Sequence, residues 1–178
     1  MHIKKSIHMK KRTTSFNLLI VVCILITNHL FAQTSINGKN IIGVWKTIDD
    51  ETGRTKSHVQ VYKKGAYYYG KIIKLLDPET LKNSGEKRFE DVKCDQCPSD
   101  HGKDQPTIGL EILWDMSATS TKWKGGSIMD PKKGKIYTCT IWMDDSDLEG
   151  NTLKVRGWVA LFYRTQTWYR VHETKIKT

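Results

Sequence analysis

The sequence has no hydrophobic run long enough to cross a membrane as a helix. The longest apolar stretch covers nine residues, 18–26, whereas a helix needs about 20 apolar residues to span the hydrocarbon core. Apolar side chains at helical spacing are also missing after residue 40, apart from a short helical turn expected at residues 78–84. We therefore expect neither a helical bundle nor a transmembrane span after residue 32.

Motifs of known catalytic chemistry are absent as well. No serine or cysteine lies in a Gly-x-Ser-x-Gly context, and no glycine-rich motif would cradle a phosphate. Gly125 and Gly126 lie in an expected strand and indicate a bulge or kink. The histidines of this region are widely separated: His58, His101 and His172. We predict no catalytic residue and no cofactor, although a missing motif does not exclude an enzyme.

The acidic residues likewise form no recognisable site. Residues 145–150 resemble the first half of a calcium-binding loop, but the twelfth position is Arg156 instead of the required glutamate. We interpret this segment as a hairpin turn. Three further acids, Glu111, Asp115 and Asp130, have no partner that the sequence reveals. A hydrolase of the two-carboxylate type would need two of them to converge.

The excess of positive charge is concentrated at the N-terminus. The chain carries 29 Lys and Arg against 19 Asp and Glu, a net charge of +10. Five of the basic residues lie in the first 32 positions, which hold no carboxylate, so the remaining 146 residues have a net charge of only +5. Such a value is ordinary for a soluble surface, and we expect no nucleic-acid partner.

Residues 1–32 have the three-part layout of a secretory signal peptide. The apolar run is preceded by a cationic segment with Lys4, Lys5, Lys10, Lys11 and Arg12. The small residue Ala32 suits the position before the cleavage site, while Leu30 is larger than usual, which leaves the cleavage position open by a residue or two. The sequence predicts an exported protein, periplasmic or secreted, with a linker at residues 33–40.

From residue 41 onward the sequence favours β-structure. Apolar residues recur at every second position in short runs, with Gly, Asp, Asn and Pro between them. The expected strands are 41–48, 54–63, 66–76, 107–115, 122–129, 135–143, 152–163 and 166–173. This spacing predicts one antiparallel all-β domain over residues 41–173, a barrel or a sandwich, and a tail at 174–178. We favour an eight-stranded barrel because closure removes exposed sheet edges.

Alternation assigns residues to the two faces of the late strands. In the segment 152–163, one face carries Leu153, Val155, Gly157, Val159 and Leu161, and the other carries Lys154, Arg156, Trp158, Ala160 and Phe162. The second face is amphipathic rather than polar. Either it is covered by other parts of the protein, or its aromatic side chains form an exposed contact patch.

Residues 77–106 form a long polar segment that interrupts the strand pattern. Its few apolar side chains, Leu81, Phe89 and Val92, cannot make a core of their own. A loop of this length inside a compact domain is often functional or stapled. It is either a variable surface loop stiffened by a disulfide, or a lid on one end of the barrel with Phe89 or Val92 facing the mouth.

Several short motifs occur in a fixed order along the chain: Gly43-Val-Trp45, Pro106-Thr-Ile-Gly109, Gly125-Gly-Ser-Ile-Met-Asp-Pro131, Gly134-Lys-Ile-Tyr137, Leu153-Lys-Val-Arg-Gly-Trp158 and Thr165-Gln-Thr-Trp-Tyr-Arg170. This set covers roughly residues 41–171 and resembles the bacterial exported domain-of-unknown-function family 2147. The resemblance implies a small secreted β-barrel of lipocalin-like (calycin) type. It implies no activity, because the family has none established.

Gly43, Trp45 and Arg170 fit a closure device of such barrels. In that device the arginine of the last strand lies across the ring of the first-strand tryptophan, a cation–π contact of about 0.5–2 kcal/mol at up to about 6 Å. We therefore expect structural roles for these three residues. The alternative is that Arg170 binds an anionic ligand. The ligand-binding residues stay unassigned.

Three cysteines follow the predicted signal peptide: Cys94, Cys97 and Cys139. An oxidising compartment favours one disulfide and leaves one thiol. Loop-closure entropy contributes about 2 kcal/mol for Cys94–Cys97 and about 4 kcal/mol for Cys97–Cys139, whereas proximity in the chain favours the first pairing. A zinc site of Cys94, Cys97, His101 and Cys139 is a further alternative.

Two functional hypotheses follow. The first is a binding module for a small apolar or amphipathic ligand, and the second is a cell-envelope protein-interaction domain with a filled barrel and no ligand. The interior distinguishes them, because large inward side chains fill a small eight-stranded barrel and small ones leave a cavity.

Overall fold

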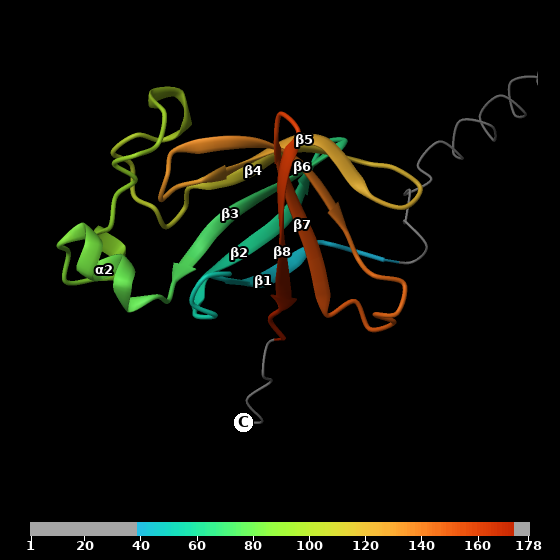
Figure 1. The fold of residues 1–178 in the computed structure, drawn as a ribbon, viewed down its shortest axis with the longest axis horizontal. Coiled ribbons are helices and arrows are strands. Elements are labelled where there is room, and N and C mark those ends of the chain that lie inside the picture. Colours follow the sequence, from blue (N-terminus) through green and yellow to red (C-terminus); the bar gives the residue numbers. More distant parts are fainter. Residues whose placement is uncertain (1–38, 173–178) are drawn as a thin grey trace, which may run out of the picture. The chain divides into compact units, whose positions relative to one another are not determined.

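Eight strands and a few short helical segments make up residues 39–172, which are the residues that the computed structural model describes (Figure 1). The predicted signal peptide, most of the linker and the tail lie outside the described residues. The strands are β1 (Gly43–Ile48), β2 (Thr55–Lys64), β3 (Tyr67–Leu75), β4 (Glu111–Ala118), β5 (Trp123–Asp130), β6 (Lys135–Trp142), β7 (Thr152–Val159) and β8 (Phe162–Arg170).

The strands close into a single antiparallel barrel. Each strand pairs with its neighbours in sequence, and β1 also pairs with β8 through Trp45–Arg170 and Lys46–Tyr169. The predicted eight-stranded antiparallel barrel is therefore confirmed. Closure leaves none of the eight strands as a free edge.

Glycine makes the expected bulge in β5. The register of β5 on β6 shifts between Lys124 and Gly126, and Gly125 between them has a φ of +84°. A Cβ atom on Gly126 would overlap the main-chain carbonyl of Trp114 in the neighbouring strand. Two glycines are thus needed in succession, the first for its backbone conformation and the second for the close approach of β4.

The turn between β7 and β8 differs from the prediction. The sequence pattern continued the seventh strand to residue 163, but the chain reverses at Ala160 and Leu161, so that Val159 pairs with Phe162. Ala160 takes a positive φ of 51° there. The turn was missed because it contains none of the Gly, Asn, Asp or Pro residues that usually mark a hairpin.

The connection from β3 to β4 contains the only α-helix among residues 39–172, α2 (Pro78–Ser84), followed by 3-10 turns at Phe89–Asp91 and Ser99–His101. Asp77 caps α2 by accepting a hydrogen bond from the Glu79 amide, and Gly85 ends it in the left-handed conformation. This short helix matches the turn expected at residues 78–84. Within the described part of the chain, no helix is long and apolar enough to cross a membrane.

Candidate functional site

The two ends of the barrel differ in construction. We call one end the closed end; it carries the β2–β3, β4–β5 and β6–β7 turns and the strand ends that lead to the chain termini. The other is the open end, with the β1–β2, β5–β6 and β7–β8 turns and the long β3–β4 connection.

Arg170 and Trp45 meet at the closed end. The guanidinium carbon of Arg170 lies 4.2 Å from the centroid of the Trp45 ring, and its nitrogens donate to the carbonyls of Gly150, Ile42 and Asn40 at 2.8, 3.1 and 2.7 Å. A Cβ atom on Gly43 would lie only 2.9 Å from Arg170 Nη1. The three residues expected to act structurally are thus brought together, with the arginine occupied by carbonyl groups.

A hollow of about 420 Å³ lies beside this arginine. It is lined by Lys39, Asn40, Met143, Asp147, Leu148, Glu149, Gly150 and Arg170. Lys39 Nζ already donates to the carbonyl of Asp144 and to Asp145 Oδ1, at 2.9 and 2.8 Å. Asp147 accepts from the amide and hydroxyl of Thr152, which lowers the pKa of Asp147. These polar groups already have hydrogen-bond partners outside the lining, so the hollow is a weak candidate for a ligand site.

Large side chains fill the barrel interior next to the closed end. Trp45, Trp123 and Trp168 are almost completely buried, and Trp123 packs edge-on against Tyr68 with ring centroids 6.1 Å apart. The other fully buried side chains are Ile41, Leu113, Met116, Ile141, Leu153, Val59, Val61 and Cys139. This half of the interior resembles an ordinary protein core.

Polar side chains replace this core toward the open end. Thr47 and Ser57, which face each other on β1 and β2, share a hydrogen bond of 2.8 Å. On β8, Gln166 accepts a bond of 3.2 Å from the indole of Trp168. Arg164, two positions further toward the open end, donates to Asp50 at 2.7 Å and lies 3.9 Å from Glu51.

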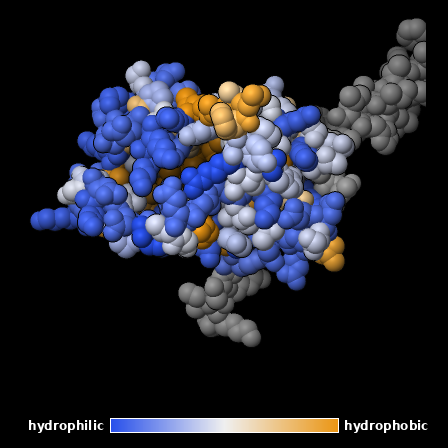
Figure 2. Space-filling model, viewed as in Figure 1, coloured by the Kyte–Doolittle hydropathy of each residue, from blue (hydrophilic) through white to orange (hydrophobic). Residues whose placement is uncertain are grey.

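Apolar groups complete the wall at this end. Tyr137 pairs with Ile128 across β5 and β6 and occupies the space beside Gly157, where an added Cβ would lie 3.1 Å from the Tyr137 Cβ. Val159 lies on the same face of β7 as Gly157, and Phe162 lies on the same face of β8 as Arg164; both are exposed. Figure 2 shows a hollow with apolar side chains at its floor and hydrophilic ones around it, between the α2 side of the molecule and the β7–β8 hairpin. We call this site the cup. It is formed by Thr47, Ser57, Arg164, Gln166, Ile128, Tyr137, Val159 and Phe162.

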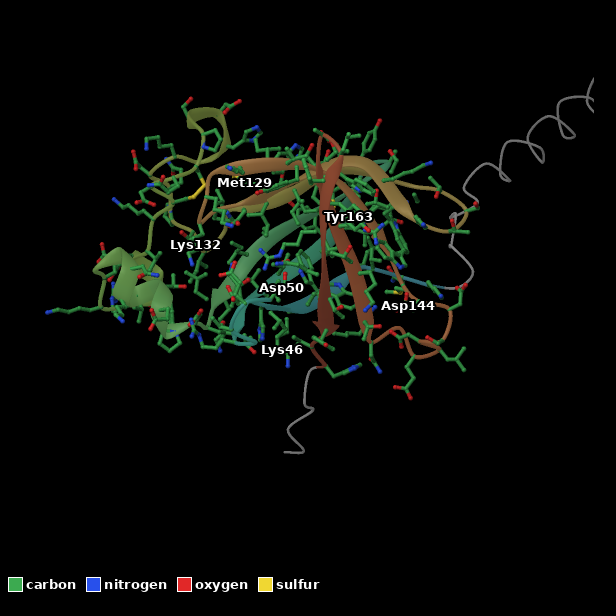
Figure 3. The ribbon with its side chains drawn as sticks, in the orientation of Figure 1. Lys46, Asp50, Met129, Lys132, Asp144 and Tyr163 are labelled. Carbon is green, nitrogen blue, oxygen red and sulfur yellow. A yellow bond between two sulfur atoms is a disulfide. The ribbon has the colours of Figure 1, made fainter. Side chains whose placement is uncertain are left out.

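The long connection is stapled and docked beside the cup. Cys94 and Cys97 form a disulfide, the pairing that proximity in the chain favours, and the Cys94 sulfur contacts the Pro131 carbonyl in the β5–β6 turn at 3.4 Å. Figure 3 shows the disulfide on the side of the barrel where Met129 and Lys132 lie. Val92 is buried and Phe89 packs partly against the core, so the segment is anchored by its own apolar side chains.

The zinc alternative is not assembled. Two of its ligands, Cys94 and Cys97, are joined in the disulfide, His101 stacks on Trp114 with ring centroids 4.7 Å apart, and Cys139 is a free thiol inside the barrel. Among residues 39–172, no three His, Cys, Asp or Glu side chains are grouped as a metal site would require.

The acids at positions 111 and 115 have partners that the sequence did not reveal. Tyr62 donates a short hydrogen bond to Glu111, and Tyr69 donates to Asp115 at 2.7 Å. The two tyrosine rings stack on the outer face of β2 and β3, 6.0 Å apart. Burial and the Glu111 hydrogen bond together raise the pKa of Tyr62 to about 12. Pairing with tyrosine, rather than with another acid, makes these carboxylates part of a structural cluster.

Sequence reasoning also missed a cluster around Arg156 on the outer face of β6, β7 and β8. Its guanidinium carbon lies 4.9, 5.5 and 4.3 Å from the rings of Trp142, Trp158 and Tyr163. Arg156 Nε also donates to Thr165 at 2.7 Å. The amphipathic alternation of this face was the only available signal, because the register that brings the three strands together is not visible in the sequence.

Comparison with known proteins agrees with this architecture. Protein HP1028 from the human pathogen Helicobacter pylori, which belongs to the lipocalin family, matches with a TM-score of 0.60 and 19% sequence identity, over 78% of this chain and 88% of that chain. At this identity the likeness concerns the fold, and the present protein is a lipocalin-like β-barrel. A model of DUF2147, described as an uncharacterized protein conserved in bacteria, matches residues 43–170. The chain belongs to that family, as its motifs predicted. A comparison with curated proteins found no match.

Proposed function

We propose that this protein is an exported binding module that holds a small amphipathic ligand in the cup. The observation that carries the proposal is the mixed lining of the cup: hydrogen-bonding groups of Gln166 and Arg164 beside the apolar surfaces of Ile128, Tyr137 and Val159. A concave site with apolar walls and a few placed polar groups is the usual form of a small-molecule site.

The filled half of the barrel limits the kind of ligand. Trp168 lies buried directly beneath Gln166, so an apolar group can enter only a short distance. The ligand therefore has a short or flat apolar part and a polar head at the rim. Arg164 is half exposed in its pair with Asp50, and pairs of this kind contribute only about 0–1 kcal/mol. An anionic head group can displace Asp50 at little cost.

The disulfide supports the exported location. Disulfides persist in oxidising compartments and are rare in the bacterial cytoplasm, and Cys94–Cys97 closes the docked segment of this chain. We propose that residues 1–32 direct export to the periplasm or beyond and are then removed. The intact mass of the protein recovered from the bacterial envelope or medium tests this, and a retained Met1 would contradict it.

Titration with an anionic amphipathic dye, anilinonaphthalene sulfonate, tests the site. Arg164→Ala should weaken dye binding about tenfold or more, since a charged hydrogen bond contributes about 1.5–3 kcal/mol. Arg54→Ala is the matched control, because Arg54 is also a half-exposed arginine at the open end and is paired with Asp77. Leu161→Asp should leave dye binding intact, because Leu161 lies in the turn between Val159 and Phe162 and is not part of the cup. Equal affinity of both arginine variants would contradict the proposal.

One observation favours a second function, a cell-envelope protein-interaction domain without a ligand. Three tryptophans fill much of the interior, and aromatic side chains are available on the outer face instead. Native mass spectrometry of the purified protein decides between the two. Extra mass that unfolding releases supports the ligand, whereas a bare chain that binds no dye supports the interaction domain.

A further inference from the structure

The β7–β8 hairpin ends in an exposed apolar tip. Val159, Leu161, Phe162 and Tyr163 are 49%, 91%, 80% and 58% exposed, and Figure 2 shows apolar surface where Figure 1 places the hairpin. Turns normally carry polar residues or glycine. Here an alanine, Ala160, occupies the left-handed conformation that side chains other than glycine rarely adopt. Neither solubility nor the backbone conformation of the turn therefore accounts for the four exposed apolar side chains at the tip.

Aromatic and basic side chains follow directly behind the tip. On the outer face, Tyr163 leads to Trp158, Arg156 and then Trp142 through the ring contacts already described. Lys122 Nζ lies 5.4 Å from the Trp142 ring, and Lys154 extends from the same face of β7. Tyr163 is labelled beside β8 in Figure 3. At the same end of the barrel, Lys132 and Lys133 of the neighbouring β5–β6 turn and Lys135 at the start of β6 are exposed.

This order of side chains matches the layers of a membrane surface. Leucine and phenylalanine bury in the acyl region, tryptophan and tyrosine prefer the level of the head groups, and arginine and lysine reach the phosphates. The cations make the patch complementary to negatively charged phosphates. The tip itself is a narrow convex projection of two strands, whereas a stable protein interface needs a broad complementary area of about 1,000 Å² or more. These features favour a lipid surface as the occupant.

We propose that the β7–β8 hairpin anchors the barrel reversibly to a bilayer that carries anionic head groups. Leu161 and Phe162 enter the boundary between head groups and acyl chains, and Arg156 contacts the phosphates together with Lys132 and Lys133 of the β5–β6 turn at the same end of the barrel. The proposal does not depend on a ligand in the cup. The hairpin lies at the open end, so docking would bring the cup to the membrane surface.

Flotation of the purified protein with vesicles tests the anchor. The vesicles contain phosphatidylglycerol and phosphatidylcholine in equal parts, with pure phosphatidylcholine for comparison. Leu161→Asp should reduce partitioning by about tenfold or more, from the transfer free energy of one leucine. Leu148→Asp is the matched control, since Leu148 is 93% exposed in the β6–β7 turn at the other end of the barrel. It should partition like the unchanged protein.

Two further measurements make the result specific. Arg156→Gln should weaken binding to the anionic vesicles, and added salt should weaken binding of the unchanged protein. Brominated lipids should quench tryptophan fluorescence, and Trp158→Phe should reduce the quenching. Equal partitioning of Leu161→Asp and Leu148→Asp would overturn the proposal. Failure of the unchanged protein to bind the anionic vesicles would overturn it as well. Sedimentation distinguishes another occupant: a dimer that Leu161→Asp dissociates, without vesicle binding, assigns the tip to a second copy of the chain.

Discussion

Gly134 in the β5–β6 turn lies against the main chain of Gln96, so closely that a Cβ atom on Gly134 would overlap the Gln96 carbonyl. Gln96 lies between the two cysteines of the disulfide. The stapled segment is therefore docked backbone to backbone on the barrel, at a position that tolerates only glycine.

Gly134→Ala should destabilise the protein more than the backbone conformation alone explains. Gly65→Ala is a close control, because both glycines have a φ of +62° and nothing lies within 4 Å of a Cβ at position 65. We expect a loss of about 1–2 kcal/mol for Gly65→Ala, from the left-handed conformation. Gly134→Ala should lose at least about 1 kcal/mol more through overpacking. Urea unfolding followed by tryptophan fluorescence measures both, and equal losses would show that the docking is loose.

Arg170→Ala should reduce the free energy of unfolding by about 2–4 kcal/mol, because the closed end loses a cation–π contact and hydrogen bonds to three carbonyls. The free energy of unfolding of Arg170→Lys should lie between those of Arg170→Ala and the unchanged protein, since the lysine ammonium keeps the charge but lacks the planar geometry of the guanidinium. Arg88→Ala serves as the control, for its pair with Asp91 is exposed to solvent. If Arg170→Lys is as stable as the unchanged protein, the geometry of the guanidinium is unimportant.

Replacement of both Cys94 and Cys97 by serine should cost about 2 kcal/mol, the value for a ring of this size. The effect should be local. The amides of Cys94, Asp104 and Thr107, which bond within the docked segment, should exchange with solvent faster, while the barrel strands keep their protection. Unchanged exchange in the double variant would mean that packing of Val92 and Phe89 holds the segment without the staple.

The buried thiol of Cys139 predicts a loss of stability at alkaline pH. Burial raises its pKa from 9.0 to about 12, so the folded protein holds this proton more tightly than the unfolded chain does. Its contribution is fully present below pH 9 and is lost as the pH rises toward 12. Between pH 9 and 10, the free energy of unfolding should fall less steeply with pH in Cys139→Ala than in the unchanged protein. This range lies below the ordinary pKa of tyrosine, 10.0, from which Tyr62 begins to contribute.

The same burial protects the thiol from reagents. A thiol-modifying reagent should detect Cys139 only after unfolding in urea, because the reactive thiolate is absent and the sulfur is inaccessible. Rapid modification of the folded protein would show that the barrel opens readily near this residue.

The barrel could be predicted because apolar residues recur at every second position along much of its strands and most of its turns contain glycine in a left-handed conformation, as at Gly53, Gly65 and Gly134. The β7–β8 turn could not, because Val159, Ala160, Leu161 and Phe162 continue an apolar pattern through the reversal. Alternation shows which residues share a face, but not which residue of the next strand lies opposite.

The candidate site was accordingly harder to predict than the fold. Trp45 and Arg170 could be paired through the family resemblance, whereas the contacts of Arg156 with Trp142 and Tyr163 depend on the registers of three strands. Tyr62 and Glu111 are likewise separated by 49 residues, and nothing in either segment points to the other. Clusters that form across a sheet become visible only when the register is known.

The pairing of β1 with β8 also governs when the barrel can be completed. Only two residue pairs join these strands, and they bring Trp45 to a partner 125 positions later in the chain. During synthesis, the edge of β1 that pairs with β8 therefore stays unpaired until β8 has been made. Closure of the barrel therefore comes after β8 has been made, and late closure of this kind is compatible with the export proposed above, because a chain has to be unfolded to pass through a narrow translocation channel.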